Sequence, residues 1–173
     1  GEELVTYEYR ELEVLKHRLP SGTVLDGEIL AFREGQPLSF GDLQKRIGRK
    51  KVSQKMMQKI PVVFRAFDLL EWKGEDIRQQ PFHQRRDHLL EAISPASDTG
   101  VLLPSEAISF EKWTTLANLR EKAREYHSEG LMLKNIHSPY LSGRKKGHWW
   151  KWKVDPLLVD AVMIYAQSGH GRR

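Results

Sequence analysis

The stretch EGLMLKNIHSPYLSGRKKGHWWKWK, residues 129–153, carries most of the information on fold and function, because six Lys or Arg follow a single acid, Glu129. Such a run indicates a phosphate-binding surface. Its last part, WKWK at 150–153, alternates aromatic and basic residues, so an extended backbone would send both lysines to one face and both tryptophans to the other. Two cations on one face could hold an anion. The alternative is an exposed basic strand whose tryptophans cover the core, since charge runs are usually solvated.

A strand-like segment lies far upstream, at residues 23–32, and reads TVLDGEILAF. An extended backbone would place Asp26 and Glu28 on the same face. Gly27 stands between them, where a side chain would obstruct a ligand or a neighbouring backbone. A three-residue DGE is also common by chance, so this segment alone is equally typical of an ordinary strand.

A second strand-like segment, PVVFRAFDLL at 61–70, is an apolar run of strand length with one acid, Asp68, directly after Phe67. On its own it reads as a buried strand. The order of the segments along the chain is more informative: LDGE comes first, then FDLL, then EGLMLK, then WKWK.

This order resembles that of the covalent nucleotidyltransferases, and within them ATP-dependent DNA ligases of the bacterial type. The likeness covers nearly all of the 173 residues and extends to LQKRIGRK at 43–50, PFHQRR at 81–86, YLSGRKKGHWWKWK at 140–153 and YAQSGHGRR at 165–173. It implies an α+β fold: a largely antiparallel, ATP-grasp-like nucleotidyltransferase sheet with packed helices, leading into the start of an oligonucleotide-binding (OB) fold. Residues 1–155 would be the adenylation domain, and residues 156–173 a linker and the first OB-fold strand.

The chain departs from the family pattern at the nucleophile. The family's nucleophilic lysine stands in a Lys-x-Asp-Gly motif, and this sequence has no such motif, since its one Asp-Gly, at Asp26, follows Val24 and Leu25. In the family that lysine lies upstream of the LDGE strand. We therefore expect an adenylation domain that is incomplete at its amino end and inactive alone. The alternative is a degenerate homologue that binds nucleotide or DNA without catalysis.

The resemblance implies an enzyme that seals nicks in duplex DNA in three steps. A lysine attacks the α-phosphate of ATP, AMP passes to the 5′-phosphate at the nick, and the 3′-hydroxyl displaces AMP. Each step needs in-line positioning and neutralisation of spread negative charge, which ATP-bound Mg²⁺ and lysines would supply. An RNA ligase or capping enzyme would share the same pocket and is the rival reading. A basic domain with coincidental motifs is the third.

The family's motifs assign nucleotide-site roles to particular residues of this chain. The resemblance implies that Glu28 lies near the ribose, that Phe67 stacks on adenine, and that two or three lysines hold the phosphates: Lys151, Lys153 and, with less support, Lys134. It also implies that Glu129, or alternatively Glu28, is the Mg²⁺ ligand, since carboxylates offer the hard oxygens that this ion prefers. Ordinary core or surface roles are the alternatives for the aromatic and the lysines.

Basic residues gather in two places, which fits a surface that follows DNA phosphates without reading sequence. The chain has 28 Lys and Arg against 23 Asp and Glu, giving a net charge of +5 and a pI near 9.4. The leading candidates for contact with nicked double-stranded DNA are Arg144, Lys145 and Lys146; the second group is Lys45, Arg46 and Arg49. A helix with solvated lysines is the alternative for the second group.

Composition is consistent with a cytoplasmic protein. The chain has no cysteine, so it has neither a disulfide framework nor a thiolate metal site, and no apolar run approaches the ~18 residues of a membrane span. The resemblance places it at the bacterial nucleoid, joined to other domains of the same polypeptide. Replication, repair, recombination and end joining are equally compatible with it.

Patterning predicts five strands, followed by a sixth at 157–166, LLVDAVMIYA, that would begin the OB fold. The five lie near 23–32, 61–70, 101–107, 131–135 and 148–154. Pro156 marks the expected boundary between domains.

Helical spacing predicts three helices. One is capped by Ser39 and Asp42 and runs through Phe40, Leu43 and Ile47 to Met57, carrying the second basic group. Another begins at Pro81, with Leu89, Leu90 and Ile93 inward and Gln84, Arg85 and Arg86 in water. The third runs from Ser109, as cap, to about Tyr126. In it, Trp113 is expected in the core.

Overall fold

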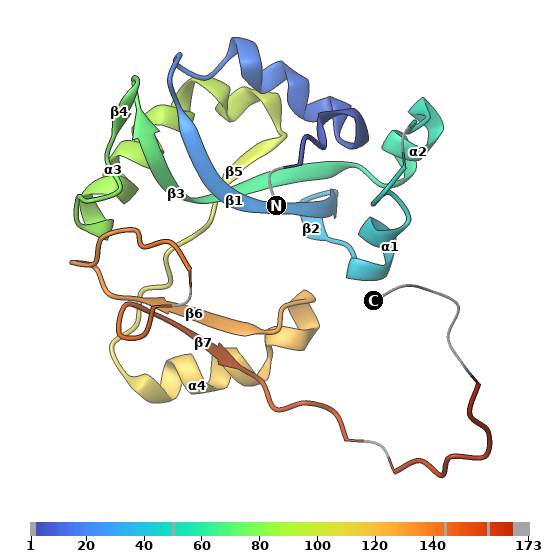
Figure 1. The fold of residues 1–173 in the computed structure, drawn as a ribbon. Coiled ribbons are helices and arrows are strands. Elements are labelled where there is room, and N and C mark those ends of the chain that lie inside the picture. Colours follow the sequence, from blue (N-terminus) through green and yellow to red (C-terminus); the bar gives the residue numbers. More distant parts are fainter. Residues whose placement is uncertain (1–2, 50, 144, 159, 168–173) are drawn as a thin grey trace.

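The computed structural model describes residues 3–49, 51–143, 145–158 and 160–167 (Figure 1). A five-stranded sheet carries most of the helices, and a separate two-stranded sheet lies beside helix α4. The elements, with 3-10 helices written η, are in chain order η1 Thr6–Glu8, η2 Arg10–His17, β1 Val24–Arg33, β2 Gln36–Pro37, α1 Phe40–Gln44, α2 Gln54–Lys59, β3 Val62–Trp72, β4 Glu75–Asp76, α3 Phe82–Ile93, η3 Ser94–Thr99, β5 Leu102–Pro104, α4 Trp113–Glu121, η4 Ala123–Tyr126, β6 Gly130–Lys134 and β7 Trp149–Lys153.

The two long strands β1 and β3 pair with each other and form the centre of the larger sheet. Its strand order is β2-β1-β3-β4, and β5 pairs with β3. All of these pairings are antiparallel except β3–β5, and the smaller sheet, β6–β7, is antiparallel too. The five strands predicted for residues 23–154 and the largely antiparallel α+β fold are therefore confirmed.

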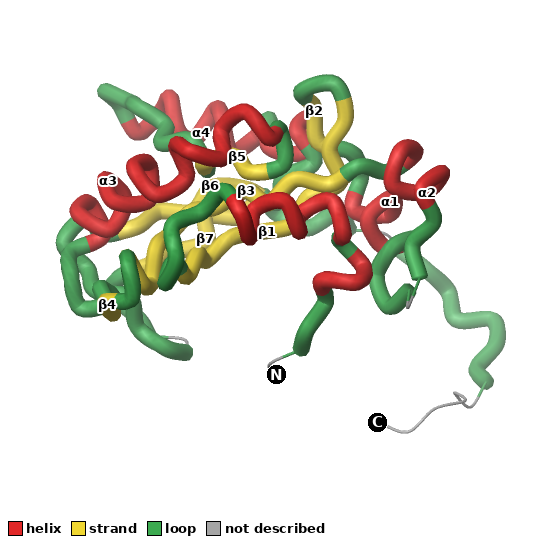
Figure 2. Tube along the Cα trace, turned by 90° about the horizontal axis from the view of Figure 1, so that it is seen from above, coloured by secondary structure: helices red, strands yellow, loops and turns green. Residues whose placement is uncertain are grey.

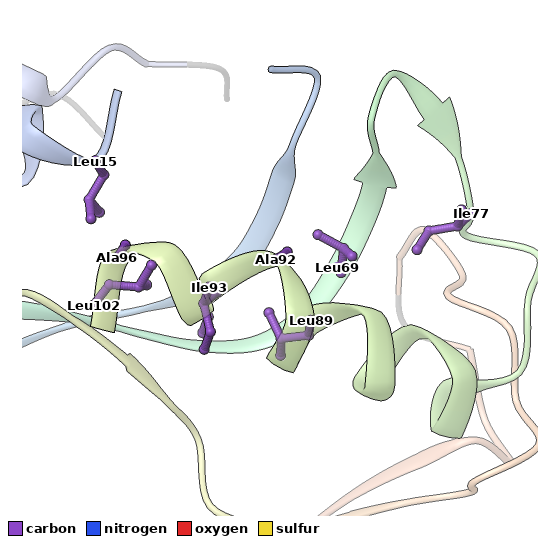
Figure 3. Close-up of a cluster of buried hydrophobic side chains, with 9 residues drawn as sticks. Leu15, Leu69, Ile77, Leu89, Ala92, Ile93, Ala96 and Leu102 are labelled. Carbon is purple, nitrogen blue, oxygen red and sulfur yellow. The ribbon is translucent and has the colours of Figure 1, made fainter. Parts of the chain in front are cut away.

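The main hydrophobic core lies between β3 and α3 (Figure 3). Ala66 and Leu69 of β3 pack with Leu89, Ala92 and Ile93 of α3, and α3 runs alongside the strands when the molecule is seen from above (Figure 2). The helical spacing predicted the inward positions of α3 at 89 and 93.

Three α3 residues differ from their predicted environment. Arg86 was expected in water, but it is partly buried and donates to the carbonyl oxygen of Ser105. Leu90 is 44% exposed, although it was expected to face inward. Arg85 was expected in water, and its side chain is fully buried. The reason lies on the neighbouring strand, where the carboxylate of Asp68 gives the guanidinium a charged partner inside the protein.

The segment from residue 40 to 59 forms two short helices, α1 and α2, and not the single helix that the apolar spacing predicted. The cap itself is confirmed, since Ser39 Oγ accepts from Asp42 N at 3.2 Å and donates to Asp42 Oδ2 at 2.8 Å. The chain then leaves the helix, and Gly48 adopts a left-handed φ of 76° that ends any helical continuation. Ser53 caps α2.

The third predicted helix begins later than expected. α4 starts at Trp113 after Lys112, which makes no side-chain cap, so Ser109 is not the cap. Trp113 is 63% exposed, so the prediction that it lies in the core is wrong. It stands at the first helical position and contacts Phe110 and Trp152, with ring centroids 5.4 and 6.5 Å away.

The chain after β7 runs without regular secondary structure through its described residues 154–158 and 160–167. Apolar side chains there are strongly exposed, among them Leu158, Val162 and Ile164. The OB-fold strand expected at 157–166 would need a neighbouring strand with which to form hydrogen bonds. It therefore stays a prediction. Among the described residues, no helix combines the length and the hydropathy that a bilayer crossing requires.

Candidate functional site

The acidic strand β1 is aligned with β3 through the segment that carries its two carboxylates. Glu28 stands opposite Arg65, and Gly27 stands opposite Ala66. A Cβ on Gly27 would lie 2.5 Å from the ring of Phe64 and 2.6 Å from the carbonyl oxygen of Arg65. The sequence-based expectation that a side chain at 27 would obstruct its surroundings is therefore confirmed, and the exposed Glu28 follows immediately.

Phe67 is the extra residue of a β-bulge. The pairing passes from Asp26–Asp68 directly to Gly27–Ala66, which leaves Phe67 with no residue opposite. A bulge interrupts the strict alternation of a strand and re-aims the side chain at that position. This explains how Ala66, Asp68 and Leu69 are all buried while Phe67 keeps part of its ring exposed.

The hairpin β6–β7 presents its basic residues on one face. Gly130 pairs with Lys153, Met132 with Lys151 and Lys134 with Trp149, and opposed residues two apart project to the same side. The two lysines of WKWK thus share a face, as predicted, and Trp150 and Trp152 take the other. Lys134 reaches β3, because its Nζ lies 3.4 Å from the carbonyl oxygen of Phe67. The face of the hairpin that carries the lysines is therefore turned toward the larger sheet.

Glu129 and Lys153 form an ion pair at the open end of the hairpin. The Nζ of Lys153 lies 2.5 Å from Glu129 Oε2, and both side chains are mostly exposed. The hydrogen bond and charge of Lys153 hold the pKa of Glu129 below its ordinary value. Two residues with separate predicted roles, metal binding and phosphate binding, are thus in contact with each other.

Gly130 makes this hairpin possible. Its φ is 141°, and a Cβ would lie 2.2 Å from the carbonyl oxygen of Trp152. Only glycine tolerates that combination of backbone angle and close approach. The pairing of β6 with β7 therefore requires the glycine of the EGLMLK motif.

Two side-chain contacts fasten residues 135–140 to the strands of the site. This segment precedes the basic loop, by which we mean the loop that carries Lys145 and Lys146. Arg85 donates to the carbonyl oxygen of Ser138 at 3.0 Å while it holds Asp68. The hydroxyl of Tyr140 donates to Asp26 Oδ2 at 2.8 Å. Burial, followed by this contact with Asp26, raises the pKa of Tyr140 to about 12.

The predicted DNA-contacting residues have different environments. Lys145 and Lys146 are exposed, and Arg144 lies outside the described residues. Lys45 is exposed and pairs with Asp42 at 2.6 Å, while Arg49 is exposed and donates to the Lys45 carbonyl.

Arg46 does not fit a role in DNA contact. Its side chain is fully buried, and it holds both carboxylate oxygens of Glu11, at 2.5 and 2.9 Å, as well as the carbonyl oxygens of Ile60 and Glu8. A phosphate could reach it only if this network opened. The prediction for Arg46 was wrong because one cation of the basic run LQKRIGRK points inward and joins the turn that follows α1 to Glu11 of η2.

Sequence reasoning missed Arg65. It stands opposite Glu28, its guanidinium carbon lies 5.8 Å from the ring of Phe32, and within the described residues its buried Nε has no hydrogen-bond partner. The signal was present in the sequence, since Arg65 is the one cation in the run PVVFRAFDLL, in which Asp68 is the only other charged residue.

The site brings some predicted residues together and leaves others apart. Lys134 contacts Phe67, and Lys153 contacts Glu129. In the described part of the chain, no hydrogen bond or ion pair joins Glu28 to Lys151 or Lys153.

A magnesium ion would find only part of its ligands here. Over the described ranges, no three His, Cys, Asp or Glu side chains gather as a metal site. Magnesium usually takes one or two carboxylates and completes its shell with water and substrate phosphates. The exposed Glu129 carboxylate fits that donor set, and Glu28 is the alternative.

Comparison with known proteins gives one consistent family. The family described as ATP dependent DNA ligase domain matches residues 1–153. A probable DNA ligase of Koribacter versatilis is 34% identical and a DNA ligase of Archaeoglobus fulgidus 32% identical, each over 94% of this chain. The chain spans 31% and 28% of these two relatives, less than a third of their length.

Solved structures agree with this family. The ligase domain of Mycobacterium tuberculosis LigD matches with a TM-score of 0.63 and 30% identity, over 86% of this chain and 44% of that one. Mycobacterial DNA ligase D, solved with ATP and MES, matches with a TM-score of 0.61 and 30% identity, over 86% of this chain and 44% of that one. Chlorella virus DNA ligase-adenylate, at 19% identity and a TM-score of 0.59 over 82% of this chain and 50% of that one, shares the fold.

Proposed function

Because this chain belongs to the family of ATP-dependent DNA ligase domains, we propose that it is the nucleotide-binding part of an enzyme that seals nicks in duplex DNA. The observation that carries the proposal is the position of Phe67. The bulge leaves Phe67 without a partner in the β1–β3 ladder, at the junction between β3, which pairs with the strand of Glu28, and the hairpin that carries Lys151 and Lys153. There its ring meets Trp149 of β7 edge to face, with centroids 6.4 Å apart, and Lys134 of β6 lies 3.4 Å from its carbonyl oxygen.

Each group at this junction suits one part of an adenine nucleotide. A flat apolar ring stacks on the base, and the exposed carboxylate of Glu28 accepts hydrogen bonds from ribose hydroxyls. Lys151 and Lys153 supply compact positive charges for the phosphate that undergoes transfer. Holding the phosphate in line and neutralising its charge are the main demands of phosphoryl transfer, so the domain contributes positioning and electrostatics.

The attacking amine is the part that this sequence does not supply in the family's motif. We propose that it comes from sequence outside residues 1–173, as do the other domains of the polypeptide. The chain would then bind ATP without becoming covalently labelled.

The ion pair between Glu129 and Lys153 gives the site a resting arrangement. A bound phosphate would attract Lys153, and the released carboxylate of Glu129 would become available to Mg²⁺, with Glu28 as the alternative ligand. The ion would supply further charge neutralisation at the phosphates. The same lysine thus links phosphate binding to exposure of the metal-binding carboxylate.

The nicked duplex is the proposed macromolecular partner. Lys145 and Lys146 come five and six residues after Tyr140, whose hydroxyl bonds Asp26, and Arg144 belongs to the same basic run. Lys45 and Arg49 form the second proposed contact, without Arg46. Contacts of this kind track phosphates and carry no base sequence information. A cytoplasmic location at the nucleoid stays a prediction.

The proposal is tested by combining equilibrium binding with covalent labelling. We expect this chain to bind ATP in the presence of Mg²⁺, to bind GTP more weakly, and to retain no AMP after denaturation. Phe67→Ala should abolish ATP binding, and Phe110→Ala, a change at an exposed aromatic on the α4 side, is the matched control. Covalent labelling of this chain would mean that another of its lysines attacks ATP. Tight binding of GTP in preference to ATP would favour a capping-type enzyme.

A further inference from the structure

The ammonium group of Lys134 lies where four elements of the fold meet. It extends from the end of β6 and stands 3.8 Å from the ring centroid of Trp149 in β7, 4.5 Å from that of Phe67 in β3 and 4.6 Å from that of Phe82 in α3. The rings of Phe67 and Trp149 also meet edge to face, with centroids 6.4 Å apart. The lysine therefore fills the space between the larger sheet and the hairpin.

The positive charge of Lys134 is balanced by ring faces and by carboxylates that are already engaged. Asp68 gives both oxygens to Arg85, and Asp26 accepts from Tyr140. Within the described residues Lys134 forms no ion pair, and its recorded hydrogen bond goes to the Phe67 carbonyl at 3.4 Å. A cation over an aromatic face is attracted by the ring's quadrupole, and the attraction grows when the cation is shielded from water.

Charged groups on every neighbouring element act on this amine. Burial lowers the pKa of Lys134 to about 8, the charges of Arg85 and Arg86 on α3 act in the same direction, and Asp68 on β3 and Asp26 on β1 oppose them. Tyr140, on the adjoining loop, is neutral at this pH because its own pKa is raised to about 12. The charge of Lys134 is therefore lost within an experimentally accessible pH range.

We propose that Lys134 is a positioning residue: its ammonium fixes the rings of Phe67 and Trp149 and thereby sets the affinity for the adenine base, and it is not a ligand of the phosphates. The inference rests on the proposed nucleotide site and goes beyond it, because the family likeness suggested a phosphate role for this lysine. The three ring contacts and the Phe67 carbonyl bond engage the ammonium on the side of the base-stacking residue.

Comparison of adenosine with ATP separates the two roles. Adenosine has no phosphate, so a positioning lysine affects both ligands equally and a phosphate ligand affects only ATP. We expect Lys134→Met, which keeps an unbranched side chain one atom shorter and removes the charge, to weaken both affinities by the same factor, about fivefold to thirtyfold for a shielded cation–π contact. Lys151→Met is the matched control and should weaken ATP alone.

Loss of ATP affinity with unchanged adenosine affinity in Lys134→Met would overturn the inference and leave the nucleotide site intact. If the unaltered chain binds neither ligand, the proposed function fails and the inference falls with it. The two failures are thus distinguishable.

A second comparison uses only cationic side chains, so it does not depend on how well the methionine variant folds. The adenosine affinity of the unaltered chain should fall as pH rises from 7 to 9, because Lys134 loses its charge. Lys134→Arg keeps its charge over that range, so its affinity should stay constant. Identical pH profiles for the two proteins would overturn the inference.

Discussion

Arg85 and Asp68 form a fully buried ion pair that joins helix α3 to strand β3. Nε of Arg85 lies 2.8 Å from Asp68 Oδ1, and Nη2 lies 2.9 Å from Oδ2. The same guanidinium donates to the carbonyl oxygens of Gln80 and Ser138. Asp68 directly follows Phe67, so this pair anchors the backbone beside the proposed base-stacking ring.

Removal of one partner of this pair should be strongly destabilising. Arg85→Met would leave the Asp68 carboxylate buried without its cation, so we expect a loss of about 3–5 kcal/mol in the free energy of unfolding. Urea denaturation measures this loss. Arg78→Met is the control, because Arg78 pairs with Asp76 at 2.7 Å on the surface and its loss should cost about 1 kcal/mol or less. Equal losses of unfolding free energy in the two variants would contradict the conclusion that the buried Arg85–Asp68 pair is more important for stability than a surface ion pair.

Substitution of Gly130 should disrupt the hairpin that carries the basic face. Ala at this position combines an unfavourable φ with an overlap against the Trp152 carbonyl oxygen, 2.2 Å from the added carbon. Gly35→Ala is the matched control, since φ is 80° there and no atom lies within 4 Å, so backbone strain alone costs about 1–2 kcal/mol. We expect Gly130→Ala to cost clearly more in thermal unfolding, and to weaken ATP binding as well.

The Glu129–Lys153 pair should respond to substitution of either partner. Glu129→Gln releases Lys153, so ATP affinity without Mg²⁺ should rise by about twofold to fivefold, the size of a surface ion pair. The gain that Mg²⁺ gives the unaltered chain should shrink at the same time. Glu125→Gln, at an exposed acid of η4, is the control. A variant that keeps the full Mg²⁺ effect would transfer the metal role to Glu28.

Stability at high pH should report the burial of the Tyr140 hydroxyl together with its hydrogen bond to Asp26. Because the pKa of Tyr140 is raised in the folded state to about 12, its contribution is complete below the unfolded value of about 10 and is lost as pH rises between the two. The free energy of unfolding should fall over that window, and it should fall less in Tyr140→Phe. Denaturation at several pH values measures the difference, and parallel curves would contradict the prediction.

The basic loop should determine how salt affects binding to a nicked duplex. Replacing Arg144 and Lys145 by Ala should weaken binding and flatten the dependence of log affinity on log salt, by about 0.9 per lost phosphate contact. Arg46→Met should leave that slope unchanged, because Arg46 is buried, and should lower stability instead. An unchanged slope in the double variant would exclude these residues from the DNA surface.

Local pattern was sufficient for five of the seven strands in the described residues, and it missed the two-residue strands β2 and β4. It failed where tertiary partners decide a residue's environment. Period-2 alternation and β-branched runs predicted β1, β3 and the face shared by Lys151 and Lys153. The buried cations Arg46 and Arg85 could not be predicted, since each depends on an acid from a distant element, Glu11 and Asp68 respectively. From the sequence alone, a charged residue is expected at the solvent-exposed surface. The acidic partner that allows an arginine to be buried is brought close only by the fold.

Helix boundaries failed for a related reason. The apolar positions from Phe40 to Met57 fit one helix in spacing, but Gly48 takes a left-handed conformation and Ser53 starts a new helix. The exposed Trp113 was misplaced because an aromatic at helical spacing does not reveal whether a neighbouring element covers it. The bulge at Phe67 has no sequence signature, so the pairing register could not be predicted either.

The bulge also separates two kinds of evolutionary constraint within β3. Ala66 and Asp68 belong to the pairing ladder and to the buried interior, so substitutions there are limited by folding. Phe67 has no partner across the ladder, so its identity is limited by the contacts of its ring with Lys134 and Trp149 and by the proposed stacking on adenine. At the proposed nucleotide site, a single substitution of Phe67 should therefore change ligand preference while the sheet keeps its register, whereas deletion of the residue would realign the strand and turn Asp68 away from Arg85.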